Sequence, residues 1–338
     1  MSFVDVNQQT QIWKDAVLGG ICFYESVPEN YFFTAEMPIV QLQAPVLEGA
    51  DIAMEIWLSR SDLSIGKPLK SGQQGAIQYR LNDELLFGVI SLPEADSLQN
   101  ATESAYRDIF ALMEEMDFPH IYRFWNYMAD INGISDGLER YRQFNVGRKD
   151  ALFAYDDDLD RHLPAACALG LANGPLTIAF LLGRQAPIAI ENPRQINAYD
   201  YPEEYGPRTP SFSRATLLRT EKNAILFISG TASIVGHLTQ HPSDVVAQTK
   251  ETLINLDAVV SEANRVMGEQ KFDLKHVYFR VYLRHAADLS LVRDEMERYL
   301  GGAIKALFVQ ADICRQELLL EIEATVGDML EVESTKCL

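Results

Sequence analysis

The chain carries the same order of apolar and amphipathic segments twice. In its C-terminal half, an apolar run at residues 224–230 precedes the segment 244–265, which is followed by the β-branched and aromatic run 276–289. Apolar residues recur every three to four positions in the middle segment, which predicts an amphipathic helix between two strands. Ser243 or Asp244 can cap this helix, because either side chain accepts a hydrogen bond from the free amides of a first turn.

The N-terminal half repeats this order. Residues 84–90 are an apolar run, residues 103–116 place apolar side chains on one helical face, and residues 120–132 read HIYRFWNYMADIN against HVYFRVYLRHAADL in the later copy. We interpret the match as a duplication, although any two α/β segments can share such a pattern. A duplication predicts an α/β (α+β) fold of two units, each a mixed sheet with helices packed on one face. A boundary near residue 150 would separate domain 1–150 from domain 151–338.

Three further segments lie outside the repeat. Residues 163–182 contain the turn signal Asn173-Gly174-Pro175 between two apolar runs, so we expect two strands there. Residues 191–214 are rich in proline and tyrosine and are expected to form a loop. Residues 327–338 are expected to be a frayed tail.

The charge of the chain restricts its partners. Of the 338 residues, 48 are acidic and 29 are basic, which gives a formal net charge of −19. An acidic surface repels nucleic-acid phosphates and anionic membranes, so neither is an expected partner. An anionic small-molecule substrate is compatible with this charge only where arginines gather in a local pocket.

Metal-binding and targeting motifs are not found. The four cysteines are scattered without CxxC spacing, and the six histidines form no HxxxH or HExxH pattern, so no metal site is expected. Residues 1–16 carry no basic segment followed by an apolar run, and no stretch approaches the roughly 18 apolar residues of a membrane-spanning helix. We therefore expect a cytoplasmic protein with reduced thiols and no signal peptide.

The C-terminal half contains an ordered set of short motifs. They are Ile228-Ser229-Gly230, Gln248-Thr249, Val281-Tyr282-Leu283, Arg298-Tyr299-Leu300-Gly301, Cys314 and Glu321-Ile322-Glu323-Ala324. This set resembles the Rid (YjgF-like) family of reactive-intermediate deaminases and implies a Rid-like fold. Rid deaminases hold a substrate carboxylate with an arginine two residues before the cysteine, whereas this chain has Asp312 there, which would repel a carboxylate. The resemblance therefore favours the fold over the deaminase activity.

Longer motifs extend over residues 120–325. They are Arg123-Phe124-Trp125-Asn126-Tyr127, Gly137-Leu138-Glu139-Arg140-Tyr141, Glu191-Asn192-Pro193-Arg194-Gln195, Tyr205-Gly206-Pro207-Arg208 and Ser229-Gly230-Thr231-Ala232-Ser233-Ile234. Together they resemble the chorismatase family, whose members have a Rid-like fold and remove the enolpyruvyl group of chorismate as pyruvate. The resemblance implies two Rid-like domains, of which the C-terminal one is catalytic, and chorismate as the small-molecule partner.

The resemblance also implies how chorismate, which has two carboxylates, would be bound. Arg208 lies in one of these motifs, and Arg148 and Arg214 lie in two further stretches of the same resemblance, Gly147-Arg148 and Pro210-Ser211-Phe212-Ser213-Arg214. A planar guanidinium forms two parallel hydrogen bonds with a carboxylate. The alternative for each arginine is an ordinary surface ion pair. Tyr205 would donate its hydroxyl to a carboxylate or only pack the loop. Thr231 and Ala232 would line the substrate site.

Glu321 is the general acid that the resemblance implies. Cleavage of the enol ether requires a proton on its methylene carbon, and a glutamate holds its proton near neutral pH only where burial disfavours its charged form. Side chains alternate along a strand, so Glu321 and Glu323 share one face while Leu320 and Ile322 share the other. Glu323 is the alternative acid, and a glutamate on a strand more commonly faces solvent.

Gly230 and Cys314 bear on the product. Chorismatases that release 3-hydroxybenzoate have a glycine and a cysteine at these places, so the resemblance implies this subtype, with both residues shaping the catalytic site. A buried cysteine is otherwise a small filler of the core. Release of 4-hydroxybenzoate as a second product stays open.

Three other functions stay open at this stage. They are a chorismate hydrolase that yields a dihydroxycyclohexadiene carboxylate, a Rid-type enamine or imine deaminase, and a non-catalytic ligand-binding protein of Rid fold. No metal or organic cofactor is expected for enol ether cleavage, and no phosphate-binding GxGxxG or GxxxxGK[ST] motif occurs in a strand and helix context. Rid proteins are trimers with sites between subunits, but a duplicated chain can build such a site internally, so we expect a monomer or a small homo-oligomer.

Overall fold

The computed structural model describes residues 17–25, 37–48, 52–59, 69–155, 163–219, 223–327 and 330–336. Within these residues, two six-stranded sheets and one four-stranded sheet make up the body of the molecule. Among the described residues, no helix combines the length and apolar character needed to cross a bilayer.

The first six-stranded sheet, here called the N-terminal sheet, has the strand order β10-β7-β11-β6-β5-β4. Its elements in chain order are β4 (Lys70–Gln74), β5 (Ile77–Leu81), β6 (Leu85–Leu92), α2 (Leu98–Met116), β7 (His120–Ala129), the short hairpin strands β8 (Ile134–Ser135) and β9 (Leu138–Glu139), α3 (Arg140–Tyr155), β10 (Ala165–Leu171) and β11 (Leu176–Gly183).

The second six-stranded sheet, here called the C-terminal sheet, has the order β12-β13-β14-β19-β17-β18. Its elements are β12 (Ile188–Ile190), η2 (Ala198–Asp200), η3 (Glu203–Tyr205), β13 (Ala215–Arg219), β14 (Ala224–Thr231), the hairpin strands β15 (Ile234–Val235) and β16 (Leu238–Thr239), α4 (Val245–Met267), η4 (Leu274–His276), β17 (Tyr278–Leu283), η5 (Ala286–Asp288), α5 (Leu289–Leu300), β18 (Lys305–Gln310) and β19 (Leu320–Gly327).

The two sheets have the same topology, which confirms the predicted fold class. Read from the β18 edge, the C-terminal sheet runs β18-β17-β19-β14-β13-β12, so that β6, α2 and β7 correspond to β14, α4 and β17. The repeated segments were thus correctly identified, although the run predicted as strand 276–289 is a strand only to Leu283, and the turn η5 then leads into α5.

Strands β10 and β11 lie beyond residue 150 but belong to the N-terminal sheet, where β11 lies between β6 and β7 and β10 pairs with β7. The chain therefore passes from one sheet to the other between Gly183 and Ile188. A division into domains 1–150 and 151–338 stays a prediction, and the strand pairing favours a later boundary.

The four-stranded sheet, of order β2-β1-β3-β20, combines the two ends of the chain. Strands β1 (Val17–Tyr24), β2 (Ile39–Gln43) and β3 (Ile52–Ser59) are joined by β20 (Leu330–Lys336), which pairs antiparallel with β3. Residues 330–336 were predicted as part of a frayed tail, which is wrong. These residues form a strand because their backbone pairs with the open edge of β3, and no local pattern of side chains indicates such a pairing.

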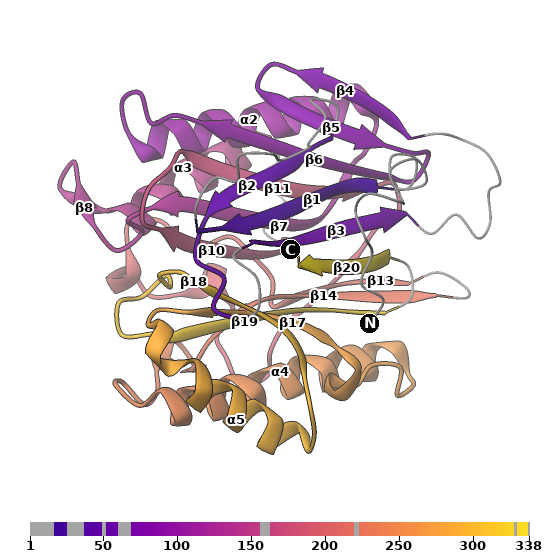
Figure 1. Ribbon diagram of the computed structural model, residues 1–338. Coiled ribbons are helices and arrows are strands. Elements are labelled where there is room, and N and C mark those ends of the chain that lie inside the picture. Colours follow the sequence, from indigo (N-terminus) through magenta and orange to yellow (C-terminus); the bar gives the residue numbers. More distant parts are fainter. Residues whose placement is uncertain are drawn as a thin grey trace.

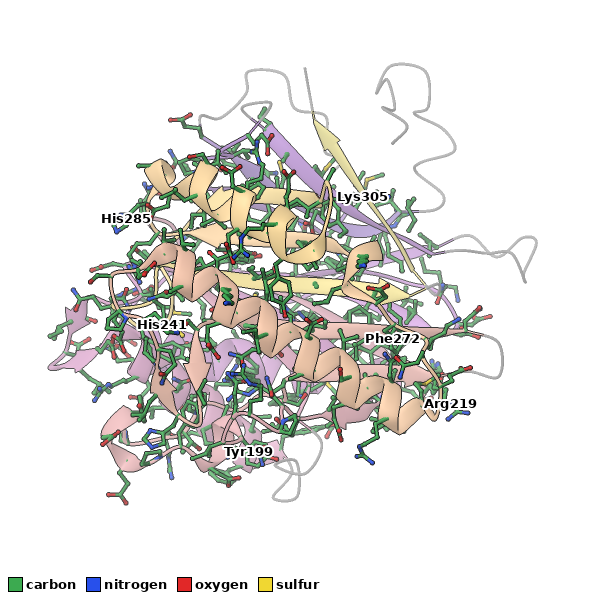
Figure 2. All side chains as sticks on the ribbon, turned by 90° about the horizontal axis from the view of Figure 1, so that it is seen from below. Tyr199, Arg219, His241, Phe272, His285 and Lys305 are labelled. Carbon is green, nitrogen blue, oxygen red and sulfur yellow. The ribbon has the colours of Figure 1, made fainter. Side chains whose placement is uncertain are left out.

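The layers run helix, sheet, sheet, helix (Figure 1), with the four-stranded sheet beside the central interface. Helices α2 and α3 pack on the outer face of the N-terminal sheet, and α4 and α5 pack on that of the C-terminal sheet. Figure 2 views the latter face, where α4 runs between His241 and Phe272 with α5 beside it. The inner faces meet in a core that includes Phe87, Trp125 and Phe227.

Helix ends follow the capping signals of the sequence. Asp244, one of the two predicted caps, accepts a hydrogen bond from the Ala247 amide, and Gly268 ends α4 with a φ of 75°. A left-handed residue stops a helix by turning its last carbonyls toward new partners, and glycine adopts that φ without steric cost.

The edge strand β10 joins the two units. The Ala165 amide donates to Thr216 Oγ1 at 2.7 Å, and the Ala166 amide donates to Ser229 Oγ at 2.9 Å. The Ser229 hydroxyl itself donates to the Ser213 carbonyl at 2.6 Å. Buried hydroxyls thus replace the partner strand that an edge strand lacks.

We expect Ser229→Ala to lower the free energy of unfolding by about 1–3 kcal/mol, because it leaves the buried Ala166 amide without an acceptor. Chemical denaturation checks this. Ser71→Ala on the exposed edge strand β4 is the control, with an expected change within about 0.5 kcal/mol. Equal effects of the two variants would contradict the role of Ser229 as a joint between the units.

Candidate active site

A cavity of about 270 Å³ opens where the two units meet. The N-terminal unit contributes side chains from α3 and β10, and the C-terminal unit contributes β14, the loop 191–214, residues 314–317 and β19. Both units of one chain therefore build the same site.

Most of the predicted site residues lie in the wall of this cavity. They are Arg148, Tyr205, Arg214, Gly230, Ala232, Cys314 and Glu321. Two others lie outside the wall. The Thr231 hydroxyl is buried and donates to the Ser229 carbonyl at 2.8 Å. Arg208 lies at the surface, where its Nη2 is 3.1 Å from Asp150 Oδ1 and its guanidinium covers Phe153, because the loop directs this side chain outward.

The Glu321 carboxyl group is buried and forms no ion pair with any of the described residues. Its side chain is 4% exposed, and its Oε1 has no hydrogen-bond partner. Burial, followed by the charge of Glu323, raises the pKa of Glu321 to about 8, while Arg123 acts in the opposite direction. Leu320 and Ile322 face the helix side of the sheet, so the strand alternation predicted from sequence holds. Glu321 is therefore mostly protonated at neutral pH, as a general acid must be.

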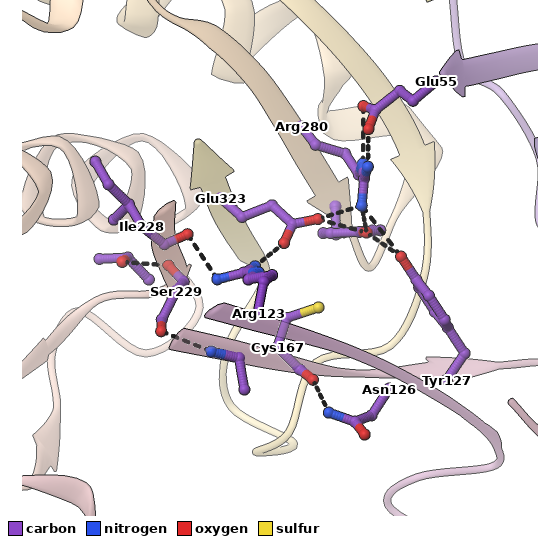
Figure 3. A network of polar contacts seen from close by, with 12 residues as sticks. Glu55, Arg123, Asn126, Tyr127, Cys167, Ile228, Ser229, Arg280 and Glu323 are labelled. Carbon is purple, nitrogen blue, oxygen red and sulfur yellow. Dashed lines mark hydrogen bonds and ion pairs between the residues drawn. The ribbon is translucent and has the colours of Figure 1, made fainter. Parts of the chain in front are cut away.

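Glu323, the alternative acid, has the opposite environment (Figure 3). It forms ion pairs with Arg123 and with Arg280, whose Nη1 is 2.6 Å from Glu323 Oε1. It also accepts a 2.9 Å hydrogen bond from the Tyr282 hydroxyl. Burial raises the pKa of Glu323, but Arg280, Arg123 and Tyr282 outweigh burial and hold it below its usual value. Glu323 is ionised and is not part of the cavity wall.

Gly230 makes room for the Glu321 carboxyl group. The pairing of β14 with β19 slips between Ile228 and Thr231, which is a β-bulge beside the cavity. A Cβ atom at position 230 would overlap Glu321 Oε1 and come within 3.2 Å of Cys167 Cβ. Any side chain larger than hydrogen would displace the Glu321 carboxyl group, so this position requires glycine for space rather than for backbone conformation.

Two buried arginines face the cavity with unused donors. Arg148 is 2% exposed, lies 5.0 Å from the centre of the Phe144 ring and has an unpartnered Nε. Arg214 donates from Nη2 to the Tyr201 hydroxyl at 2.9 Å, and its Nε is also unpartnered. Among the described residues, neither arginine has a carboxylate at ion-pair distance. Such guanidinium groups are suited to an anionic ligand that brings its own acceptors.

Arg315 is a third cation of the wall and was not among the residues predicted from the sequence. Its guanidinium lies 4.2 Å from the centre of the Tyr205 ring, one Nη donates to the His237 carbonyl at 2.8 Å, and the other is buried without a partner. Tyr201, beneath both Arg214 and Arg315, was missed as well. Arg315 directly follows the predicted site residue Cys314, and this position in the sequence could have indicated that Arg315 belongs to the site.

Tyr205 supports this arrangement. Its hydroxyl donates to the His237 carbonyl at 2.8 Å, and its ring lies under Arg315. Of the two predicted roles, packing of the loop is the one for which the structure provides contacts. Arg142 also lines the cavity, but Glu139 Oε2 lies 3.0 Å from its Nε.

Cys314 and Asp312 lie on the segment that follows β18. Burial, and then Glu321, raises the pKa of the Cys314 thiol to about 12, so the thiol keeps its proton beside the acid. Asp312 forms an ion pair with Arg284 and is not part of the cavity wall. The described residues contain no cluster of three or more histidine, cysteine, aspartate or glutamate side chains that could hold a metal ion.

Comparisons with known proteins agree on one family. Residues 55–182 match the family model described as chorismatase FkbO/Hyg5-like, N-terminal. A chorismatase from Streptomyces hygroscopicus is 37% identical over 81% of this chain and 79% of its own length. A 3-hydroxybenzoate synthase from the same species is 32% identical over 88% of this chain and 90% of its own.

A solved structure leads to the same family. The crystal structure of a chorismatase at 1.08 Å resolution superposes with a TM-score of 0.83 and 32% identity, covering 96% of this chain and 97% of the other. An identity above 30% over most of both chains shows common descent, and the matching fold extends it to nearly all residues. The chain is therefore an enzyme of the chorismatase family.

Proposed function

We propose that this protein cleaves chorismate to pyruvate and 3-hydroxybenzoate. The observation that carries the proposal is the protonated, buried Glu321 in a cavity whose wall contains three guanidinium groups without carboxylate partners among the described residues. The names chorismatase and 3-hydroxybenzoate synthase of the relatives support this substrate and this product.

The cavity suits a small dianion. Chorismate has two carboxylates, and Arg148, Arg214 and Arg315 place positive charge on the wall of a site in an otherwise acidic chain. A volume of about 270 Å³ lies near the lower end of the range for ligand pockets, which suits a single-ring molecule.

In the proposed reaction, Glu321 donates its proton to the methylene carbon of the enolpyruvyl ether. The resulting oxocarbenium weakens the bond between the ether oxygen and ring carbon 3. The 4-hydroxyl oxygen then attacks that carbon and gives its proton to the Glu321 carboxylate, and pyruvate leaves with the ether oxygen. The epoxide that forms opens to 3-hydroxybenzoate, so no water is consumed and no cofactor is required.

Two of the other functions predict different chemistry. A hydrolase would add water to the activated ether and release a dihydrodiol, which requires water beside the ring. The Cys314 thiol in the cavity wall is uncharged and is a weak hydrogen-bonding group, so it holds a water molecule poorly, which favours attack by the hydroxyl of the substrate. Deamination of the Rid type would use an arginine where Asp312 stands, and Asp312 is paired away from the cavity. Release of some 4-hydroxybenzoate is compatible with the same site.

We further propose that a single chain is the working unit, because both of its own units supply residues to the cavity. A cytoplasmic location stays a prediction.

We expect Glu321→Gln to reduce pyruvate release from chorismate by about 10²–10⁴-fold, because glutamine keeps the shape of the side chain but has no acidic proton. In the unchanged protein, activity should fall as pH rises through about 8, since the ionised acid cannot donate. Coupled detection of pyruvate measures both. Glu262→Gln on α4, a half-buried glutamate outside the cavity wall, is the control. Full activity of Glu321→Gln would refute the assignment.

The arginines provide a second test. Arg148→Ala should raise the KM for chorismate about 10- to 100-fold, because a hydrogen bond to a charged group contributes about 1.5–3 kcal/mol. Arg208→Ala is the matched control, since Arg208 lies outside the wall, and its KM should not change. Circular dichroism verifies that both variants fold. A larger effect at Arg208 than at Arg148 would contradict the site.

Cys314→Ala tests the step that follows protonation. The variant should change the ratio of 3-hydroxybenzoate, 4-hydroxybenzoate and dihydrodiol more than it changes total pyruvate. A shift of ~1.4 kcal/mol at a branch point alters a ratio tenfold, and an admitted water or a lost thiol contact is of that order. Chromatography at matched pyruvate yield provides the measurement. An unchanged mixture would make Cys314 a filler of the cavity wall.

A further inference from the structure

A chain of buried charges runs from the four-stranded sheet to the strand of the acid (Figure 3). Glu55 on β3 pairs with Arg280 on β17, whose Nε donates to Glu55 Oε1 at 2.9 Å. Arg280 continues to Glu323 on β19 at 2.6 Å, and Glu323 pairs with Arg123 on β7. The four residues are 2–3% exposed and come from three different sheets.

These four residues are unlike an ordinary structural ion pair. Two carboxylates and two guanidinium groups sum to a formal charge of zero, yet all four are removed from water. Burying such a set commonly contributes no net stability compared with apolar side chains of the same size.

The link to the site is the spacing along β19. Glu323 lies two residues after Glu321 on the same face, which separates their Cα atoms by about 6.8 Å at the usual rise of a strand. Glu323 does not line the cavity and so does not touch the ligand. At that separation in a buried region its charge still acts on the ionised form of Glu321.

The other charged and titratable groups around Glu321 are cations, neutral groups and two carboxylates that have partners of their own. Arg123 from β7 and the wall arginines Arg148, Arg214 and Arg315 carry positive charge. Burial raises the pKa of the Cys167 and Cys314 thiols and of the Tyr141 hydroxyl, so these groups are uncharged at neutral pH. The remaining charged groups of the wall are Glu139 with its partner Arg142, and Glu317, which accepts from Thr239.

We propose that Glu323 is a positioning residue whose fixed negative charge keeps Glu321 protonated, and that Glu55 holds this charge in place through Arg280. The inference rests on the proposed function, because it concerns the acid of that reaction. The nearby guanidinium of Arg123 favours the ionised form of Glu321, and an ionised Glu321 cannot donate. The charge of Glu323 opposes Arg123 without occupying the cavity.

Activity should be lost at alkaline pH when Glu321 ionises. The proposal predicts for each variant whether the pH of this loss rises or falls. Glu323→Gln removes the negative charge and should lower this pH by about one unit. Glu323→Asp keeps the charge and should retain the original profile. Arg123→Gln removes a positive charge and should raise this pH. Glu55→Gln should lower it by less than Glu323→Gln, because Glu55 is farther from the acid.

The experiment measures kcat for pyruvate release from chorismate between pH 5 and pH 10 for the full-length protein and these variants. A structural role for Glu323 would lower activity or stability in every variant but would not move the profile in opposite directions. An unchanged profile in Glu323→Gln, or equal shifts in Glu323→Gln and Glu323→Asp, would overturn the proposal.

A direct titration makes the test independent of turnover and of any one variant. Carbon-13 NMR of protein labelled at the glutamate carboxyl carbons, compared with Glu321→Gln, identifies the Glu321 signal. Glu321 should titrate near pH 8, and its titration should move to lower pH in Glu323→Gln or, if that variant does not fold, in Glu55→Gln. Titration of Glu321 at an ordinary glutamate pH in the unchanged protein would overturn the proposal. Absence of pyruvate release with a titration near pH 8 would instead refute the proposed substrate alone.

Discussion

Burial of the Glu321 carboxyl group, which forms no ion pair within the described part of the chain, is the interaction on which the rest of this site depends. Removing a carboxylate from water disfavours its charged form, and the nearby Glu323 adds to that effect. The bulge at Gly230 provides the space, since a Cβ atom there would overlap the acid. The hydroxyl of the adjacent Ser229 holds β10 against the bulge, so the joint between the units and the position of the acid share one stretch of chain.

The environment of each glutamate follows from which neighbours reach it. Glu321 and Glu323 are chemically identical, share one face of one strand and are both buried. Arg123 and Arg280 reach Glu323 from β7 and β17 and hold it ionised, whereas no such partner contacts Glu321 Oε1. Their neighbours move the pKa values of the two carboxyl groups in opposite directions. One group therefore keeps its proton and can act as an acid, whereas the other is a fixed negative charge.

The duplication of the fold did not duplicate the site. Glu321 lies opposite Tyr282 in the C-terminal sheet, and Thr177 lies opposite Tyr127 in the N-terminal sheet, with the two tyrosine hydroxyls 2.9 Å apart. Thr177 has no titratable group, and its hydroxyl forms a 3.0 Å hydrogen bond with the Ser91 hydroxyl. The N-terminal unit therefore contributes a wall, through α3 and β10, while the C-terminal unit contributes the acid.

Much of this arrangement was determined by the sequence alone. Hydrophobic periodicity located the repeated strand, helix and strand, because burial on one face of a helix or a sheet imposes a regular spacing on apolar residues. Family motifs indicated Glu321, Gly230, Cys314 and Arg214 before any geometry was known.

Other features were decided only by the tertiary structure. The outward direction of Arg208, the inward direction of Arg315, the strand at residues 330–336 and the passage between sheets after Gly183 all depend on contacts between distant parts of the chain. The same holds for Glu55, which acts on the site through an arginine 225 positions away in sequence. Local patterns report which residues will be buried, but the direction of a side chain and the charge it meets depend on which segments pack together.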